Sequence, residues 1–157
     1  MNKKIVTLLI VLIAAVSIAS VCAAELTKVN DFDGKFKMNI TGNDTVKGLT
    51  DSLQNSNNGG NTYQSQSAWT VNDGVSVYYY NDAINSVVST LKSNSAFMNN
   101  PKVEGNLTIL EDTTSPEGAS YALKYFVGVQ SPDNSTTVFV GSNDLNLAKE
   151  YANTIGF

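Results

Sequence analysis

The 157-residue chain contains no histidine and no arginine, and its single cysteine is Cys22. The absence of histidine excludes the usual acid–base group of neutral pH, the Ser-His dyad and imidazole metal ligands. The absence of arginine excludes bidentate binding of phosphate or carboxylate by a planar guanidinium group. Carboxylates, tyrosines, lysines and serines are the groups left for chemistry. We therefore expect a protein that is not an enzyme and that holds no cofactor and no metal.

The first 24 residues have the order of a secretory signal peptide. Two lysines precede an apolar run, Ile5–Val21, which carries no charge, and small residues close the run before Glu25. We expect cleavage near Ala24. The alternative is an uncleaved anchor, although a run of 17 residues lies at the lower limit for crossing a bilayer. Cys22 does not follow a small residue, which disfavours a lipid anchor. The sequence predicts a secreted or cell-surface protein that meets the membrane only through an uncleaved signal.

Residues 25–157 have the length of a single domain and are enough to bury a core. They contain eight lysines and 14 acidic residues, which gives a net charge of −6. This charge opposes binding to nucleic acid and to anionic lipid. Because the segment has no cysteine, its core must hold together without disulfide bonds.

Hydrophobic periodicity predicts a mixture of strands and helices. Alternating apolar and polar residues predict strands over residues 35–40, 62–71, 75–80, 103–109, 121–129 and 136–140. Helical spacing predicts helices over residues 46–53, over 82–97 with Asp82 as N-cap, and over a terminal stretch capped by Ser142 or Asn143. The order lacks regular strand–helix–strand alternation. We therefore expect the α+β class, with a mainly antiparallel sheet of about five or six strands and two or three helices packed on it.

The clearest hairpin joins residues 62–71 to residues 75–80. A three-residue loop, Asn72-Asp73-Gly74, with Gly74 in the left-handed conformation pairs Trp69 with Val77. This register places the apolar side chains on one face and the polar side chains on the other.

The polar face of this hairpin is the candidate binding platform, formed by Tyr78, Tyr80, Gln64 and Gln66. Aromatic rings beside amide groups on an exposed sheet stack on sugar rings or anchor a protein partner. The alternative, which we favour, is that a helix covers this face and makes the two tyrosines part of the core.

Two further motifs are weaker signals. The sequons at Asn39, Asn43, Asn106 and Asn134 are candidate glycosylation sites, although the asparagine, serine and threonine content alone produces about this number by chance. The segment 31–34, Asp-Phe-Asp-Gly, carries oxygen ligands suited to calcium. It lacks the length and the closing glutamate of a calcium loop, so we expect an ordinary solvated turn.

Several segments together resemble small exported proteins of methanogenic archaea. They are the lysine-flanked signal, the strand 36–40, the tyrosine-rich strand before a helix, and the closing segments 138–149 and 152–157. The layout is also similar to the PsbP-like α+β sandwich, which likewise ends in a strand, a helix and an aromatic residue. The first group has no established function and the second resemblance is architectural, so neither resemblance assigns a functional residue.

These observations predict a non-catalytic exported or cell-surface domain that binds a protein partner or a glycan, and not nucleic acid. A small hydrolase that uses two carboxylates is the first alternative, because such a pair suffices for glycoside hydrolysis. A structural component of the cell envelope is the second.

Overall fold

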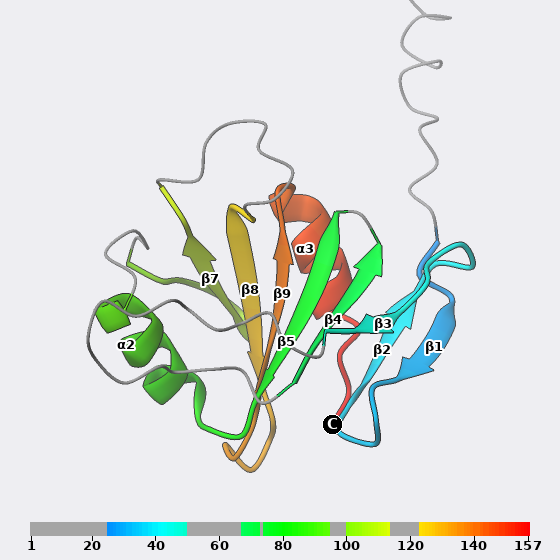
Figure 1. The fold of residues 1–157 in the computed structure, drawn as a ribbon. Coiled ribbons are helices and arrows are strands. Elements are labelled where there is room, and N and C mark those ends of the chain that lie inside the picture. The colour runs from blue at the N-terminus through cyan, green and yellow to red at the C-terminus, as the bar shows by residue number, and fades with distance from the viewer. Residues whose placement is uncertain (1–24, 50–66, 73, 95–99, 114–122) are drawn as a thin grey trace, which may run out of the picture.

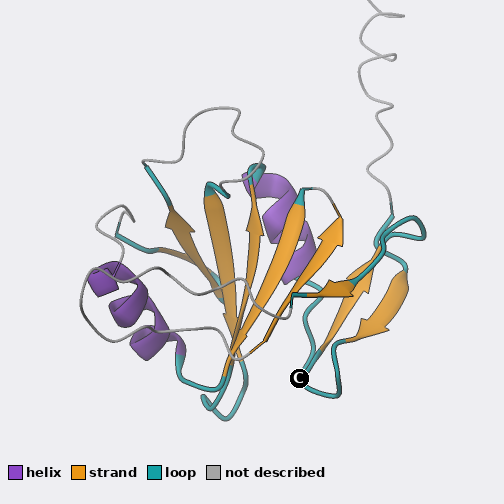
Figure 2. Ribbon diagram, in the orientation of Figure 1, coloured by secondary structure: helices purple, strands orange, loops and turns teal. Residues whose placement is uncertain are grey.

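The computed structural model describes residues 25–49, 67–72, 74–94, 100–113 and 123–157. A seven-stranded antiparallel sheet lies between one helix on one face and, on the other, a second helix and a two-stranded hairpin (Figures 1 and 2). The expected α+β class and the mainly antiparallel sheet are confirmed. The described residues contain nine strands, more than expected, and two helices. The signal segment 1–24, the Asn-rich stretch 55–61, Gln64 and Gln66 lie outside these residues.

Every neighbouring pair of strands is antiparallel. The small sheet consists of β1 (Lys28–Asp31) and β2 (Lys37–Ile40). The large sheet has the spatial order β3-β4-β5-β9-β8-β7-β6. Its strands are β3 (Lys47–Gly48), β4 (Ser67–Asn72), β5 (Val75–Tyr80), β6 (Lys102–Glu104), β7 (Leu107–Glu111), β8 (Tyr125–Gln130) and β9 (Thr137–Ser142). The helices are α2 (Ile84–Asn94) and α3 (Leu145–Ala152).

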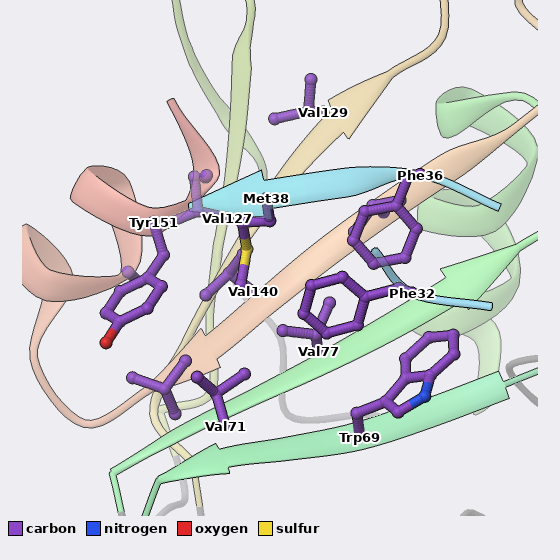
Figure 3. Close-up of a cluster of buried hydrophobic side chains, with 14 of the residues drawn as sticks. Phe32, Phe36, Met38, Trp69, Val71, Val77, Val127, Val129, Val140 and Tyr151 are labelled. Atoms are coloured by element: carbon purple, nitrogen blue, oxygen red, sulfur yellow. The ribbon is translucent and has the colours of Figure 1, made fainter. Parts of the chain in front are cut away.

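One core fills the space between the large sheet and the layer formed by α3 and the β1–β2 hairpin. The alternating residues of β2 supply it from one side, since Met38 and Ile40 are buried while their neighbours in the strand are not. In Figure 3 the rings of Phe32, Phe36 and Trp69 lie together at one end of this core. The two phenylalanine rings stack at 4.6 Å, and Trp69 meets them edge-on at 5.3 and 5.7 Å. This aromatic contact fixes the hairpin on the sheet.

A second core lies between the opposite face of the sheet and α2. The helix presents the expected apolar stripe to the sheet: Ile84, Val87, Val88 and Leu91. The side chains of Tyr78, Tyr80 and Phe139 meet this stripe from β5 and β9. Both faces of β5 are therefore covered, which explains why five of its six residues are buried.

The structure confirms the register of the β4–β5 hairpin and corrects its turn. Trp69 pairs with Val77 as expected, but Val75 pairs with Asn72 after a bulge. Gly74 does not adopt the left-handed conformation, and the Asn72 side chain stabilises the turn by accepting a hydrogen bond from the Gly74 N–H at 2.9 Å. Strain on replacing Gly74 is therefore not expected from its backbone angle.

Three other predictions need correction. Residues 47–48 form β3 instead of a helix, because they pair with Thr70 and Trp69 of β4. Residues 103–109 are not one strand, since the chain turns at Gly105, whose φ of 61° suits glycine. The last helix is capped by Asp144 instead of Ser142 or Asn143, because the Asp144 carboxylate accepts the N–H groups of the first turn.

The remaining predicted elements are placed as follows. The segment 31–34 is a turn, as expected, in which the Asp31 carboxylate accepts a hydrogen bond from the Gly34 N–H at 2.6 Å. The helix expected over 82–97 is confirmed over Ile84–Asn94, and residues 95–97 lie outside the described chain. It begins two residues after Asp82, whose carboxylate accepts a hydrogen bond from the Ala83 N–H at 2.7 Å. Among the described residues, none of the helices has the length and apolar character needed to cross a membrane.

Candidate functional site

A small surface hollow lies where β6, β7 and β8 pass the first turns of α3. We call it the edge hollow. Its volume is about 60 Å³, and it is lined by Asn100, Lys102, Glu104, Ile109, Glu111, Tyr125 and Leu145. Register explains the grouping: Lys102 is opposite Ile109, and Glu111 is opposite Tyr125, so these side chains share one face of the sheet.

Ion pairs organise the charges around the edge hollow. Lys149 of α3 donates to Glu104 at 2.6 Å, and the Lys124 ammonium lies 3.7 Å from Glu111. Lys124 also lies 5.3 Å from the centre of the Tyr125 ring, a distance suited to a cation–π contact. Lys102 is exposed and has no carboxylate partner within the part of the chain that the structure describes. The edge hollow therefore presents one uncompensated positive charge beside two paired carboxylates.

The size of the edge hollow limits what it can do. Pockets that enclose a small molecule have volumes of roughly 300–1,000 Å³, whereas this one measures about 60 Å³. It can receive the end of one side chain but cannot enclose a sugar ring. Groups of three or more potential metal-binding side chains are not found among the described residues.

A second polar cluster has a structural role. Tyr151 of α3 donates to Asp44 Oδ2 at 2.6 Å, and Asn72 Nδ2 donates to Asp44 Oδ1 at 3.0 Å. Burial raises the pKa of Asp44, but the hydrogen bonds from Tyr151, Asn72 and Thr41 outweigh burial, so its pKa is lowered overall. Burial, followed by the bond to Asp44, raises the pKa of Tyr151. The cluster joins the loop after β2, the β4–β5 turn and α3.

The candidate platform on β5 is not an exposed surface. Tyr78 and Tyr80 are only 8% and 7% exposed, because α2 packs over the face that carries them. Burial also raises the pKa of the Tyr78 hydroxyl. The prediction of a binding platform is therefore wrong for these two residues, and the favoured alternative, a core position under a helix, is confirmed. Gln64 and Gln66 lie outside the described residues.

The four sequons lie at separate places on the surface. Asn43, Asn106 and Asn134 are exposed in turns, and Asn134 adopts a left-handed φ of 60°. Asn39 is half-buried in β2, where its N–H donates to Thr154 Oγ1 at 3.0 Å. Their glycosylation stays a prediction.

Periodicity did not reveal the residues of the edge hollow, yet one signal for them was present. The dipeptide Gly105-Asn106 between two alternating runs is a turn signal for a two-residue hairpin. That signal would have divided residues 103–109 into two paired strands, β6 and β7. It would also have placed Lys102 and Glu104 on the same sheet face as Ile109. The contribution of Lys149 depends on how α3 packs, for which the sequence has no local signal.

Comparisons of the chain with protein-family models, with curated proteins and with solved structures found no match.

Proposed function

We propose that the protein is a non-catalytic exported or cell-surface domain that binds a protein partner at the edge hollow. Three features of the edge hollow support this proposal. It lies at an exposed edge of the sheet, it contains a half-buried tyrosine ring, and it carries a lysine without a carboxylate partner among the described residues. An aromatic ring beside charged groups at a rim is typical of protein–protein contacts.

A protein fits the edge hollow better than a glycan. Sugars bind to proteins by stacking on an open aromatic face, but the ammonium group of Lys124 lies over the Tyr125 ring. The charges of Lys102, Glu104 and Glu111 suit a partner that carries charges of its own. Export is supported by the order of residues 1–24 in the sequence.

The hydrolase alternative has one observation in its favour, because Glu104 and Glu111 are two carboxylates that line the same hollow. Each is engaged by a lysine, and the hollow does not enclose a substrate. A structural role in the cell envelope remains the other alternative, and it would need repeated contacts between copies.

Binding to separated surface fractions tests the proposal. The full chain is immobilised, and binding of the surface-protein fraction and of the polysaccharide fraction of the producing cells is measured by interferometry. Lys102→Glu should weaken protein binding at least ~10-fold, which corresponds to about 1.4 kcal/mol. The matched control is Lys28→Glu, which reverses an exposed lysine on β1.

Two outcomes would contradict this function. One is protein binding that Lys102→Glu and Lys28→Glu reduce equally. The other is hydrolysis of the polysaccharide fraction that Glu104→Gln or Glu111→Gln abolishes.

A further inference from the structure

Strand β6 is the last strand of the large sheet, and its outer edge faces no other strand of the described chain. All three of its residues are exposed. Val103 is 71% exposed, more than Val29 and Phe157, the other large hydrophobic side chains that are exposed among the described residues. An exposed sheet edge is a template on which a further strand pairs.

The turn after β6 determines which backbone groups point outward. Glu104 pairs with Leu107 across the two residues Gly105 and Asn106, so the carbonyl of Glu104 accepts the closing hydrogen bond of the turn. Hydrogen-bonded and non-hydrogen-bonded pairs alternate along an antiparallel ladder. Val103 and Thr108 are therefore a non-hydrogen-bonded pair, and the N–H and C=O of Val103 point away from β7.

We propose that β6 pairs with β6 of a second copy of this chain, which makes one continuous sheet across a two-fold axis. Val103 lies opposite Val103 of the second copy, and each donates its N–H to the carbonyl of the other. Lys102 then lies opposite Glu104 of the second copy, and Glu104 lies opposite Lys102. The sequence Lys-Val-Glu is therefore complementary in charge to itself about its central residue.

The exposed strand β1 lacks this complementarity. A two-fold axis normal to the sheet keeps each side chain on its own face, so opposite residues must be an even number of positions apart. Pairing of β1 about Val29 would place Lys28 opposite Asn30, and pairing about Asn30 would place Val29 opposite Asp31. Neither arrangement matches opposite charges. Although both strands carry an exposed valine, only β6 is therefore expected to pair with a second copy of itself.

Strand β6 and the residue before it include lysine and proline, which commonly protect sheet edges from pairing, but both are compatible with this dimer. Lysine on an edge strand discourages pairing when it meets no opposite charge, but here Lys102 meets Glu104. Pro101 lacks an N–H, so it limits the contact to the short segment around Val103. A contact this short predicts a weak dimer that dissociates at high salt, because salt screens exposed ion pairs.

Pairing also brings the edge hollows of the two copies next to each other. The axis normal to the sheet keeps the α3 faces of both copies on the same side. Since Lys102 and Glu104 line the edge hollow and also flank the axis, the two hollows become neighbours in one larger surface. This inference does not depend on the proposed partner, and its test needs no ligand.

Cysteine cross-linking tests the contact. The full chain carries Cys22→Ala together with Val103→Cys or, as the matched control, Val29→Cys, since Val29 is 62% exposed on the edge strand β1. Opposite residues of a hydrogen-bonded pair have Cα atoms about 5.5 Å apart, within the range of a disulfide. Oxidation should link most of the Val103→Cys chains and few of the Val29→Cys chains. Equal linking of both variants, or none, would overturn the proposal.

Charge exchange tests the register. In sedimentation velocity at low salt, Lys102→Glu should weaken the dimer at least ~10-fold, because Glu then lies opposite Glu. The double variant Lys102→Glu/Glu104→Lys should restore association, since the opposite charges are exchanged but still matched. A dimer unaffected by Lys102→Glu, or a wild-type chain that stays monomeric at all concentrations, would refute pairing through β6.

Discussion

The hydroxyl of Tyr151 should contribute measurably to stability, because it lies at the centre of a partly buried polar cluster. The Tyr151 side chain is only 1% exposed. Its hydroxyl donates to Asp44 at 2.6 Å and accepts from Asn72 at 3.2 Å. Tyr151→Phe keeps the packing of the ring and removes both bonds. A hydrogen bond to a charged group contributes about 1.5–3 kcal/mol, and we expect about 1.5 kcal/mol because Asp44 is only half-buried.

The same cluster predicts how this loss depends on pH. The pKa of Asp44 is lowered in the folded state. Its stabilisation is therefore fully present above the unfolded pKa of about 4 and is lost as the pH falls through the folded pKa. The pKa of Tyr151 is raised, so its contribution is complete below a pH of about 10 and is lost as the pH rises through the folded value. The difference between wild type and Tyr151→Phe should be largest between these limits.

Urea unfolding from pH 7 down to pH 2 measures this difference. Tyr125→Phe is the matched control, because the Tyr125 hydroxyl makes no side-chain hydrogen bond within the described residues. At pH 7 the free energy of unfolding of the Tyr151→Phe variant should be lower than that of wild type by about 1.5 kcal/mol. The free energy of unfolding of the control should stay within about 0.5 kcal/mol of wild type. An equal effect of both variants at pH 7, or a Tyr151→Phe loss that does not shrink in acid, would refute the role assigned to the cluster.

Two predictions concern the cores. A Cβ atom on Gly128 would lie 2.5 Å from Cε1 of the buried Phe139 ring, so Gly128→Ala should lower the free energy of unfolding by about 1–3 kcal/mol. The control is Gly42→Ala, because a Cβ atom on Gly42 would have no atom within 4 Å. Equal urea midpoints for the two variants would contradict the predicted crowding at Gly128. Trp69→Ala and Tyr80→Ala should each cost about 3–5 kcal/mol, because both rings are buried, on opposite faces of the sheet. A harmless Tyr80→Ala in thermal melts would mean that α2 does not cover this face.

The sequence predicted those elements whose side chains alternate between a buried and an exposed face. Strand β2 is an example, because Met38 and Ile40 face the core while Lys37 does not. The stripe of α2 was equally clear, since only one side of that helix is buried. Where a strand is as short as the two residues of β3, local spacing misleads. Val46 and Leu49 have helical spacing, but pairing with β4 makes residues 47–48 a strand.

The candidate site was harder to predict, for a reason that β5 illustrates. Alternation shows that Tyr78 and Tyr80 share a face, but it does not show whether that face is covered. Coverage depends on where the chain places α2, which follows from contacts between segments distant in sequence. The edge hollow has the same origin, because Lys149 reaches Glu104 across 45 positions in the chain. Long-range packing therefore decides which polar residues meet.

The two sheet edges that involve β2 and β6 show how the fold treats unpaired backbone groups. The outer edge of β2 is covered by the C-terminal residues: Lys37 and Gly156 exchange hydrogen bonds of 2.8 and 2.9 Å. The chain has no such segment over β6 among its described residues. At β6 the outward N–H and C=O of Val103 are left to water or to another strand, beside a valine side chain that gains from leaving water. A second β6 strand satisfies both requirements at once, which is the physical reason to expect association at this edge.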